Sequence, residues 1–179
     1  VELVVKPVVD TMKQRGIPYK GVLYAGLMIN NGIPYVLEFN CRFGDPETQP
    51  VLSRIDGDLL PAILAACDGT LDGTLIKWKP QAAVCVVLAS GGYPDDYDKG
   101  FEISGLEEAS AKKDIVIFHA GTRCDGGRWF TNGGRVLGVT ALGSDVAEAK
   151  ARAYEAVACI SWKGMHYRKD IADKALNKK

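Results

Sequence analysis

The segment Glu38–Glu47, EFNCRFGDPE, contains the residues of this chain with the clearest chemical potential. It ends an apolar run with an acid, an amide and a guanidinium at alternate positions, which are Glu38, Asn40 and Arg42. Because side chains alternate between the two faces of a strand, we expect these three on one face. The apolar side chains between them would then point toward a core. The pattern predicts a polar site at the end of a strand.

Two oxygen ligands two residues apart on a strand lie about 7 Å from each other. That spacing suits a hard cation such as Mg²⁺, which takes one or two protein oxygens and completes its shell with water and phosphate oxygens. Arg42 would follow on the same face, where a guanidinium can hold an anionic substrate or a developing negative charge. The same pattern also describes an ordinary solvated strand end. The residues alone leave both interpretations open.

A turn and a helix are predicted directly after this site. Gly44 permits a tight turn, Asp45 is a good N-cap, and Pro46 suits the first helical position. The free N–H groups of a helix N-terminus favour anions. Strand, polar residues and helix start are therefore expected to converge within ten residues.

Composition excludes several classes of function. Apolar residues make up 47% and charged residues 25% of 179 residues, which is typical of a globular protein with one or two small domains. The net charge is zero, which disfavours nucleic acid as a partner. No run is long and apolar enough to predict a membrane span. The five cysteines are scattered and form no C-x-x-C pair, which indicates reduced thiols and a cytoplasmic location.

Periodicity and turn signals predict an α+β fold. Asn31-Gly32 is typical of a two-residue hairpin turn, and the later strand-like runs are short and joined by turns. Such a pattern favours an antiparallel sheet with a helix packed on it. The chain is expected to divide into residues 1–72 and 73–179. The expected elements are a first helix ending near Gly16, strands at 21–30 and 34–40, helices from Pro46 to about Ile55 and after Asp58, strands at 82–89, 101–106 and 115–122, two strands within 128–141, and a helix at about 145–160.

Several segments together resemble the phosphoribosylamine–glycine ligase family, whose members are ATP-grasp ligases. They cover nearly the whole chain in the order expected for that family, which makes a chance match improbable. The segment LEFNCRFGDPETQ carries most of the resemblance. The others are GIPYKGVLYAGLM at 16–28, ASGGYP at 89–94, FHAGT at 118–122, TNGGRV at 131–136 and YRKDI at 167–171.

The resemblance implies a fold and a reaction. Residues 1–72 would be the C-terminal part of an ATP-grasp domain, and residues 73–179 a small C-terminal domain like that of biotin carboxylase. The family joins glycine to 5-phosphoribosylamine with ATP as co-substrate, through a glycyl phosphate, in purine biosynthesis. Glu38 and Asn40 would be ligands of Mg²⁺ or Mn²⁺, and Arg42 would be catalytic. The preceding strand lacks the acid that many ATP-grasp enzymes have, so Glu38 would bridge two ions or phosphates would hold the second.

Further residues would bind substrate by the same resemblance. For each of them the residues also support a simpler interpretation. Asp45 and Glu47 suit a helix cap and a first-turn charge, and either one suits an ion pair with Arg42. The Gly-Gly-Arg sequence at 133–135 suits a turn between strands with an exposed arginine. The substrate-binding candidates are Asp45, Glu47, Gly133, Gly134 and Arg135.

The glycine-rich phosphate loop, the adenine-binding strand and the N-terminal substrate domain of the family have no counterpart in this chain. We therefore expect the missing N-terminal region of the same enzyme to be a partner, and the chain alone to be inactive. The alternatives are another ATP-grasp carboxylate–amine ligase, a carboxylase, or a non-catalytic binding module derived from this fold.

Overall fold

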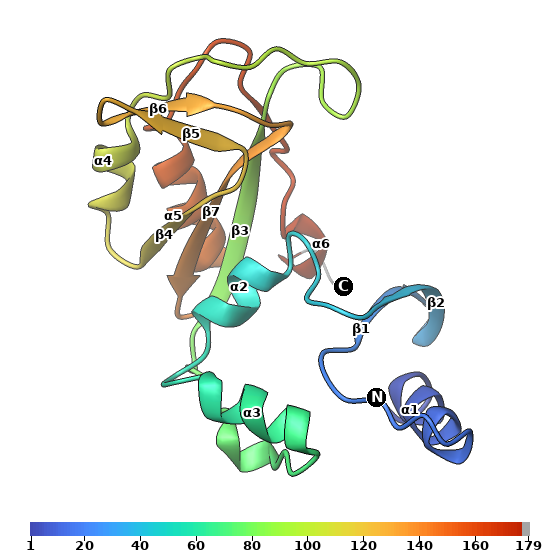
Figure 1. Ribbon diagram of the computed structural model, residues 1–179. Helices are drawn as coiled ribbons and strands as arrows, with labels where there is room; N and C mark the ends of the chain where they lie inside the picture. Colours follow the sequence, from blue (N-terminus) through green and yellow to red (C-terminus); the bar gives the residue numbers. More distant parts are fainter. Residues whose placement is uncertain (177–179) are drawn as a thin grey trace. The chain divides into compact units, whose positions relative to one another are not determined.

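A computed structural model describes residues 1–176 of the chain (Figure 1). Residue contacts divide it into two compact units. The first comprises residues 1–45 and 55–77, and the second comprises residues 46–54 and 78–179. Each unit is described by itself. This division reflects which residues contact one another and is not a test of domain boundaries. The domain boundary predicted between residues 72 and 73 therefore stays a prediction.

The first unit contains a β-hairpin and short helices. The hairpin turn is Asn31-Gly32, with φ angles of 49° and 78°, the left-handed values that the Asn-Gly sequence predicted. Helix α3 ends at Gly69, which takes the left-handed φ of 79° that glycine tolerates best. The elements are α1 (Val5–Gln14), β1 (Tyr24–Asn30), β2 (Ile33–Asn40), α3 (Leu60–Asp68) and the 3₁₀ turn η1 (Gly73–Leu75).

The hairpin carries an irregularity beside the predicted polar site. Gly26 pairs with Glu38, but its neighbour Leu27 pairs with Val36, so Leu37 is an extra residue in β2. The apolar face expected to meet a core is exposed: Leu37 is 65% and Phe39 is 40% accessible. That expectation was wrong for residues 1–176. The hairpin has only two strands, and a sheet this small needs another element packed on its apolar face to bury it.

The second unit is built on an antiparallel sheet with strand order β4-β7-β3-β8. A separate hairpin, β5–β6, extends from it. This matches the predicted antiparallel sheet with a packed helix. The elements are α2 (Thr48–Ser53), β3 (Ala82–Ala89), α4 (Leu106–Ser110), β4 (Ile115–His119), β5 (Thr122–Asp125), β6 (Arg128–Thr131), β7 (Arg135–Gly143), α5 (Val146–Val157), β8 (His166–Tyr167) and α6 (Asp173–Leu176).

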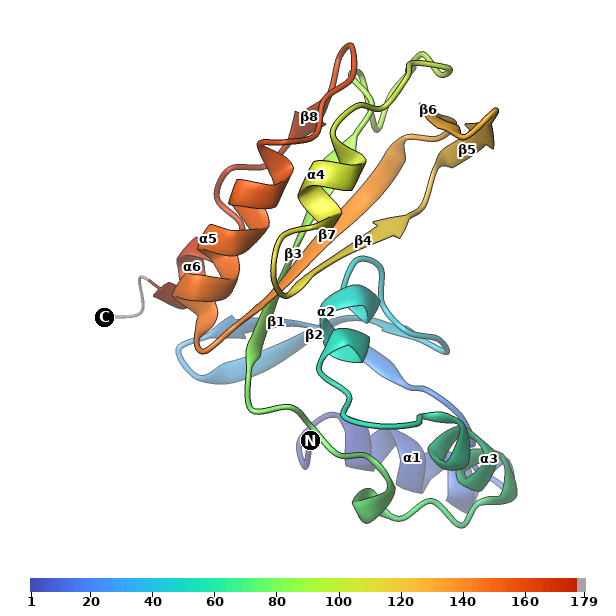
Figure 2. The ribbon, with the colours of Figure 1, turned by 90° about the vertical axis from the view of Figure 1, so that its left-hand side faces the viewer.

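The core of the second unit lies between the sheet and α5 (Figure 2). Val84, Val86 and Leu88 alternate along β3, so all three point to one face, where they are at most 5% exposed. Small side chains on α5 let the helix approach this face closely, and Ala149 and Ala153 are fully buried. The opposite face of β3 is only partly covered, in part by α2, and this face becomes important below.

Two expectations for local structure were wrong. The strand expected at 101–106 is limited to isolated bridges at Glu102 and Ser104, and α4 begins at Leu106. The helix expected from Pro46 begins at Thr48, with Glu47 at its N-cap position and no side-chain cap. Residues 45–47 form a turn, so Asp45 does not cap α2. No helix within residues 1–176 is long and apolar enough to cross a membrane.

Candidate functional site

Glu38 and Asn40 meet at the end of β2. The Asn40 amide Nδ2 donates a hydrogen bond to the Glu38 carboxylate Oε1 over 2.9 Å. Side chains two residues apart can make such a bond only from one strand face, so this part of the sequence-based prediction is confirmed. Glu38 is exposed and Asn40 is half-buried, which leaves the pair accessible to a ligand.

The pair fits a cation that phosphates help to coordinate. Both residues offer oxygen ligands, and a half-turn of the Asn40 amide brings its oxygen beside the Glu38 carboxylate. On β1 the facing residue is Gly26, where an added Cβ would lie 3.1 Å from the Glu38 Cγ. In residues 1–176 no cluster of three or more His, Cys, Asp or Glu could hold a metal by itself. A cation here would therefore depend on substrate oxygens.

Arg42 lies beyond the strand that was expected to orient it. β2 ends at Asn40, and Arg42 stands in a bend where its Nη1 donates to the Phe43 carbonyl over 2.8 Å. Strand alternation therefore does not place Arg42 beside Glu38 and Asn40. Its guanidinium is exposed, and Nη1 forms its only hydrogen bond in the described part of the chain.

The acidic candidates Asp45 and Glu47 are both exposed in the turn before α2. Glu47 lines a shallow hollow of about 270 Å³ in the second unit, together with Pro46 and Pro50. An ion pair of either acid with Arg42 stays a prediction, and the hydrogen bond that Arg42 makes is the one to the Phe43 carbonyl.

Gly133 and Gly134 connect β6 to β7, and close packing explains both glycines. A Cβ on Gly134 would lie 2.2 Å from Cδ2 of the Tyr93 ring, and a Cβ on Gly133 would lie 2.8 Å from Cα of Gly121. Ser90 holds the same turn, since its Oγ donates to the Gly133 carbonyl over 2.9 Å. The turn is thus closely packed, and Arg135 follows it as the first residue of β7.

Arg135 lines a pocket of about 370 Å³ in the second unit, which we call the Arg135 pocket. Its polar lining is basic and aromatic. His166 was not predicted to join Arg135 there, because the long-range pairings of β3 with β7 and with β8 bring the two residues together. The lining residues are Pro46, Cys85, Val87, Ala89, Tyr93, Pro94, Arg135, His166, Tyr167, Arg168 and Ile171.

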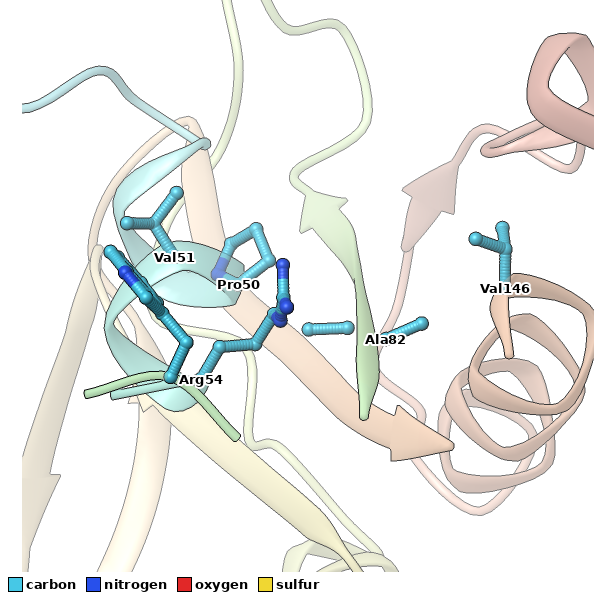
Figure 3. Close-up of a pocket in the computed structure, with 7 residues that line it drawn as sticks. Pro50, Val51, Arg54, Ala82 and Val146 are labelled. Atoms are coloured by element: carbon cyan, nitrogen blue, oxygen red, sulfur yellow. The ribbon is translucent and has the colours of Figure 1, made fainter. Parts of the chain in front are cut away.

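A larger hollow of about 580 Å³ contains none of the predicted site residues (Figure 3). It is mostly apolar, with Pro50 and Val51 on its wall. The Arg54 guanidinium lies 6.0 Å from the centre of the Trp78 ring, and its Nη2 donates to the Lys79 carbonyl over 3.3 Å. Size alone therefore does not identify the site, and chemistry favours the smaller Arg135 pocket.

His119, the last residue of β4, packs against its neighbours. Its ring packs on Trp129 with the ring centres 4.0 Å apart, and Nδ1 is 3.0 Å from Thr122 Oγ1. Although the residue keeps an exposed edge, partial burial lowers the pKa of its imidazole. It does not line the Arg135 pocket.

Known proteins resemble this chain over both units. The profile described as "Phosphoribosylglycinamide synthetase, ATP-grasp (A) domain" matches residues 1–48. The profile described as "Phosphoribosylglycinamide synthetase, C domain" matches residues 83–174. Phosphoribosylamine–glycine ligase of Neisseria meningitidis serogroup B is 54% identical over 98% of this chain and 41% of its own length. The enzyme of Rhodopirellula baltica is 52% identical over 95% and 39%.

Solved structures agree on the fold. Phosphoribosylamine–glycine ligase of Thermotoga maritima matches with a TM-score of 0.74 and 37% identity, over 89% of this chain and 39% of that one. Urea carboxylase of Kluyveromyces lactis matches with a TM-score of 0.59 and 14% identity, over 91% of this chain and 14% of that one, which shows a shared fold alone.

Fold and sequence together define the class: an ATP-grasp protein, with matches to the ATP-grasp (A) domain and to the C domain of phosphoribosylglycinamide synthetase. The chain belongs to the phosphoribosylglycinamide synthetase family. It spans about two fifths of the length of the curated relatives that it matches.

Proposed function

We propose that the complete protein joins glycine to 5-phosphoribosylamine in de novo purine biosynthesis, with ATP as co-substrate, and that this chain is its C-terminal portion. Family membership carries the proposal. The contact between Glu38 and Asn40 supports it, because it holds two possible oxygen ligands side by side at the end of β2. We also place the protein in the cytoplasm, where its five free thiols would stay reduced.

The proposed reaction has two steps. A glycine carboxylate oxygen bonds to the γ-phosphorus of ATP while the bond to the β–γ bridging oxygen breaks, giving glycyl phosphate and ADP. The amine nitrogen of phosphoribosylamine then bonds to the acyl carbon, phosphate leaves, and the amine loses a proton. Catalysis of such transfers depends on positioning and on neutralising negative charge.

We assign roles in this reaction to residues of the first unit. Glu38 and Asn40 would hold Mg²⁺ or Mn²⁺, which neutralises phosphate charge when it is bound. Arg42 would direct its remaining N–H donors to the glycine carboxylate or the acyl phosphate, because Nη1 alone is engaged with a backbone carbonyl. Asp45 would contact a substrate amine.

The remaining proposed substrate contacts belong to the second unit. Glu47 lies on the hollow beside α2, and Arg135 lies in a basic pocket. Gly133 and Gly134 form the packed turn that leads to Arg135. These residues would bind the substrate phosphoribosylamine. The N-terminal region of the same enzyme would supply the other contacts to the substrates.

The test is ADP release by this chain rejoined to its upstream region, supplied with glycine, ATP, Mg²⁺ and freshly generated phosphoribosylamine. We expect release to require both glycine and the amine, and to fall at least about 100-fold in Glu38→Ala. Glu155→Ala is the matched control, because this glutamate is exposed on α5 and its carboxylate makes no hydrogen bond within residues 1–176.

Other outcomes favour the rival functions. ADP release with a different amine would indicate another carboxylate–amine ligase, and a requirement for biotin would indicate a carboxylase. A folded wild-type protein that releases no ADP under any of these conditions would leave a non-catalytic binding module.

A further inference from the structure

The hollow of about 580 Å³ lies in the second unit, where the end of α2 meets the start of β3 (Figure 3). Its volume is typical of small-molecule sites. Ala83 lies on the face of β3 opposite the buried core, which is the face that α2 contacts. Pro50 and Val51 of α2 form an apolar wall. We call this space the Arg54 hollow, after the charged residue that lines it.

Arg54 follows the last residue of α2, and its guanidinium extends toward β3 (Figure 3). Its Nε is buried and makes no hydrogen bond within residues 1–176. Its Nη2 donates to the Lys79 carbonyl over 3.3 Å, which is long for such a bond. A guanidinium has five N–H donors, and a buried donor without an acceptor costs free energy. Arg54 would therefore be stabilised by a ligand that brings acceptor oxygens into the hollow.

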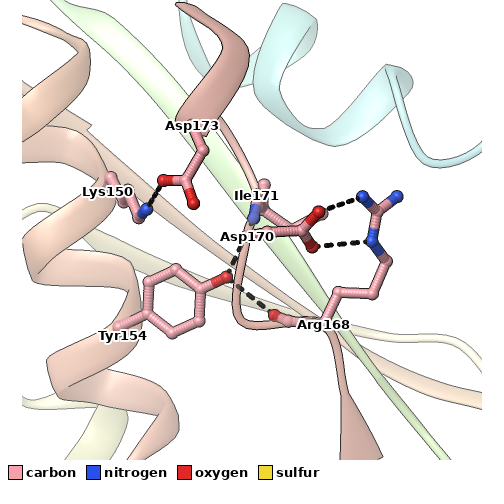
Figure 4. A network of polar contacts seen from close by, with 6 residues as sticks. All are labelled: Lys150, Tyr154, Arg168, Asp170, Ile171 and Asp173. Atoms are coloured by element: carbon pink, nitrogen blue, oxygen red, sulfur yellow. Dashed lines mark hydrogen bonds and ion pairs between the residues drawn. The ribbon is translucent and has the colours of Figure 1, made fainter. Parts of the chain in front are cut away.

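Arg168 shows how another arginine of the second unit is neutralised. Its Nε and Nη2 donate to the two carboxylate oxygens of Asp170 over 2.9 Å and 2.6 Å (Figure 4). The Arg54 guanidinium instead lies 6.0 Å from the centre of the Trp78 ring. In the described part of the chain, Arg54 has no carboxylate partner. The hollow thus combines an unneutralised cation with apolar walls.

Lys79 holds the charged and aromatic parts of the hollow together. Its backbone N–H donates to the Arg54 carbonyl over 2.7 Å, and its Nζ donates to the Ser53 carbonyl over 3.0 Å. These bonds fasten the segment that carries Trp78 to the end of α2. Trp78 is 51% exposed, so its ring is open to a ligand. Guanidinium and ring are therefore in place before a ligand arrives, which lowers the ordering cost of binding.

We propose that the Arg54 hollow binds a small carboxylic acid with a flat apolar group, such as an aryl acetate. The carboxylate accepts hydrogen bonds from the Arg54 guanidinium, and the ring lies against Trp78 and the apolar wall of α2. A monoanion suits the hollow better than a phosphate dianion, because one guanidinium among apolar side chains would leave the second charge unpaired. This site is separate from the proposed ligase reaction and does not depend on it.

Three matched ligands test the proposal on this chain. Phenylacetate is titrated while NMR follows the tryptophan indole N–H and arginine Nε–H signals, with phenylacetamide and acetate in parallel titrations. We expect saturable shifts for Trp78 and Arg54, with phenylacetate bound at least tenfold more tightly than the other two, because it alone has both charge and ring. Binding of phenylacetate no tighter than that of phenylacetamide or of acetate would overturn the proposal, as would the absence of saturable shifts.

Variants separate Arg54 from general charge. We expect Arg54→Gln to weaken phenylacetate binding at least tenfold and to leave phenylacetamide binding within twofold, because it removes the charge and keeps a side-chain donor. Arg128→Gln is the matched control. The Arg128 guanidinium also lies over an aromatic ring, 5.5 Å from the centre of Phe130, but outside the hollow. Equal loss of phenylacetate binding in both variants would overturn the role of Arg54.

Trp78→Leu tests the aromatic contact, and it decides the question if Arg54→Gln does not fold. We expect phenylacetate binding to weaken at least threefold, followed by the Arg54 Nε–H signal, and unchanged binding would refute the site. The titration is then repeated on the chain rejoined to its upstream region. Affinity within threefold of that of this chain would support a ligand site in the complete protein. Loss of binding there would show that the upstream region fills the hollow, and would overturn the proposal.

Discussion

At the scale of single residues, Asn40 is the sharpest test of the polar pair on β2. Its amide contacts the Glu38 carboxylate, and no further cluster of metal-ligating residues occurs within residues 1–176. We expect Asn40→Ala in the rejoined enzyme to raise the Mg²⁺ concentration for half-maximal ADP release about tenfold or more, because one of two protein oxygens is lost. Asn30→Ala, at the exposed end of β1, should leave that concentration unchanged, and an equal rise in both variants would contradict a metal role.

The close packing of Gly134 against the Tyr93 ring can be tested by adding a single methyl group. A methyl group there would overlap the Tyr93 ring, which in turn lines the Arg135 pocket. We expect Gly134→Ala to lower the free energy of unfolding by about 1–3 kcal/mol, measured by urea denaturation. Gly73→Ala, which meets nothing within 4 Å, should stay within about 0.5 kcal/mol of wild type. A neutral Gly134→Ala would show that the Tyr93 ring moves aside at no cost.

Sequence reasoning found the residues that local rules connect and missed those that distant pairing connects. Glu38 and Asn40 were predictable as neighbours, because alternation along one strand suffices. Arg42 was misjudged, since the strand ends before it. His166 was not predicted beside Arg135, because their proximity depends on two strand pairings across more than thirty residues.

At the scale of elements, the start of α5 carries a reciprocal cap. The Asp145 carboxylate accepts from the Glu148 N–H over 2.8 Å, and the Glu148 carboxylate accepts from the Ser144 N–H over 2.6 Å. We expect Asp145→Ala to lower the free energy of unfolding by about 1 kcal/mol, measured by urea denaturation. Asp98→Ala in an exposed loop should have no comparable effect, and equal losses would argue against capping.

The same cap predicts a dependence on pH. The hydrogen bond from the Ser144 N–H lowers the pKa of Glu148, and Arg152 lowers it further. Because the folded pKa lies below the unfolded one, the stabilisation is present above the unfolded pKa and is lost as pH falls through the folded pKa. The difference in stability between wild type and Glu148→Gln should therefore shrink as the pH falls below the ordinary glutamate pKa, which thermal unfolding at a series of pH values would measure.

Glu155→Gln is the matched control for this pH dependence. It lies on the same helix, and its carboxylate makes no hydrogen bond in the described part of the chain. Its stability difference from wild type should change little over that pH range. A Glu148→Gln difference that stays constant across the range would contradict the cap as its source.

Elements were predicted well where both their ends carry turn signals. The hairpin of β1 and β2 followed from Asn31-Gly32, and α5 followed from its alanine-rich sequence, although Asp145 and not the expected Ser144 is its N-cap. The expected strand at 101–106 failed because only Glu102 and Ser104 find bridge partners. Pairing with a distant partner decides such short apolar runs, and local sequence does not report it.

At the scale of the whole molecule, the β1–β2 hairpin exposes apolar surface. The hairpin exposes Ile29, Tyr35 and Leu37 by more than half of their surfaces, and the chain spans about two fifths of the length of its curated relatives. The ATP-grasp profile matches only residues 1–48. Residues outside that span must complete the contacts to ATP if the proposed function is right.

The chain alone should therefore not turn over. Phosphoryl transfer needs the triphosphate held in line with its acceptor, and two oxygens on one strand cannot provide that. We expect ADP release by the isolated chain to equal the rate without protein, while adding the upstream region restores it. Release by the isolated chain above that rate, abolished in Glu38→Ala, would show instead that residues 1–179 contain a complete catalytic site.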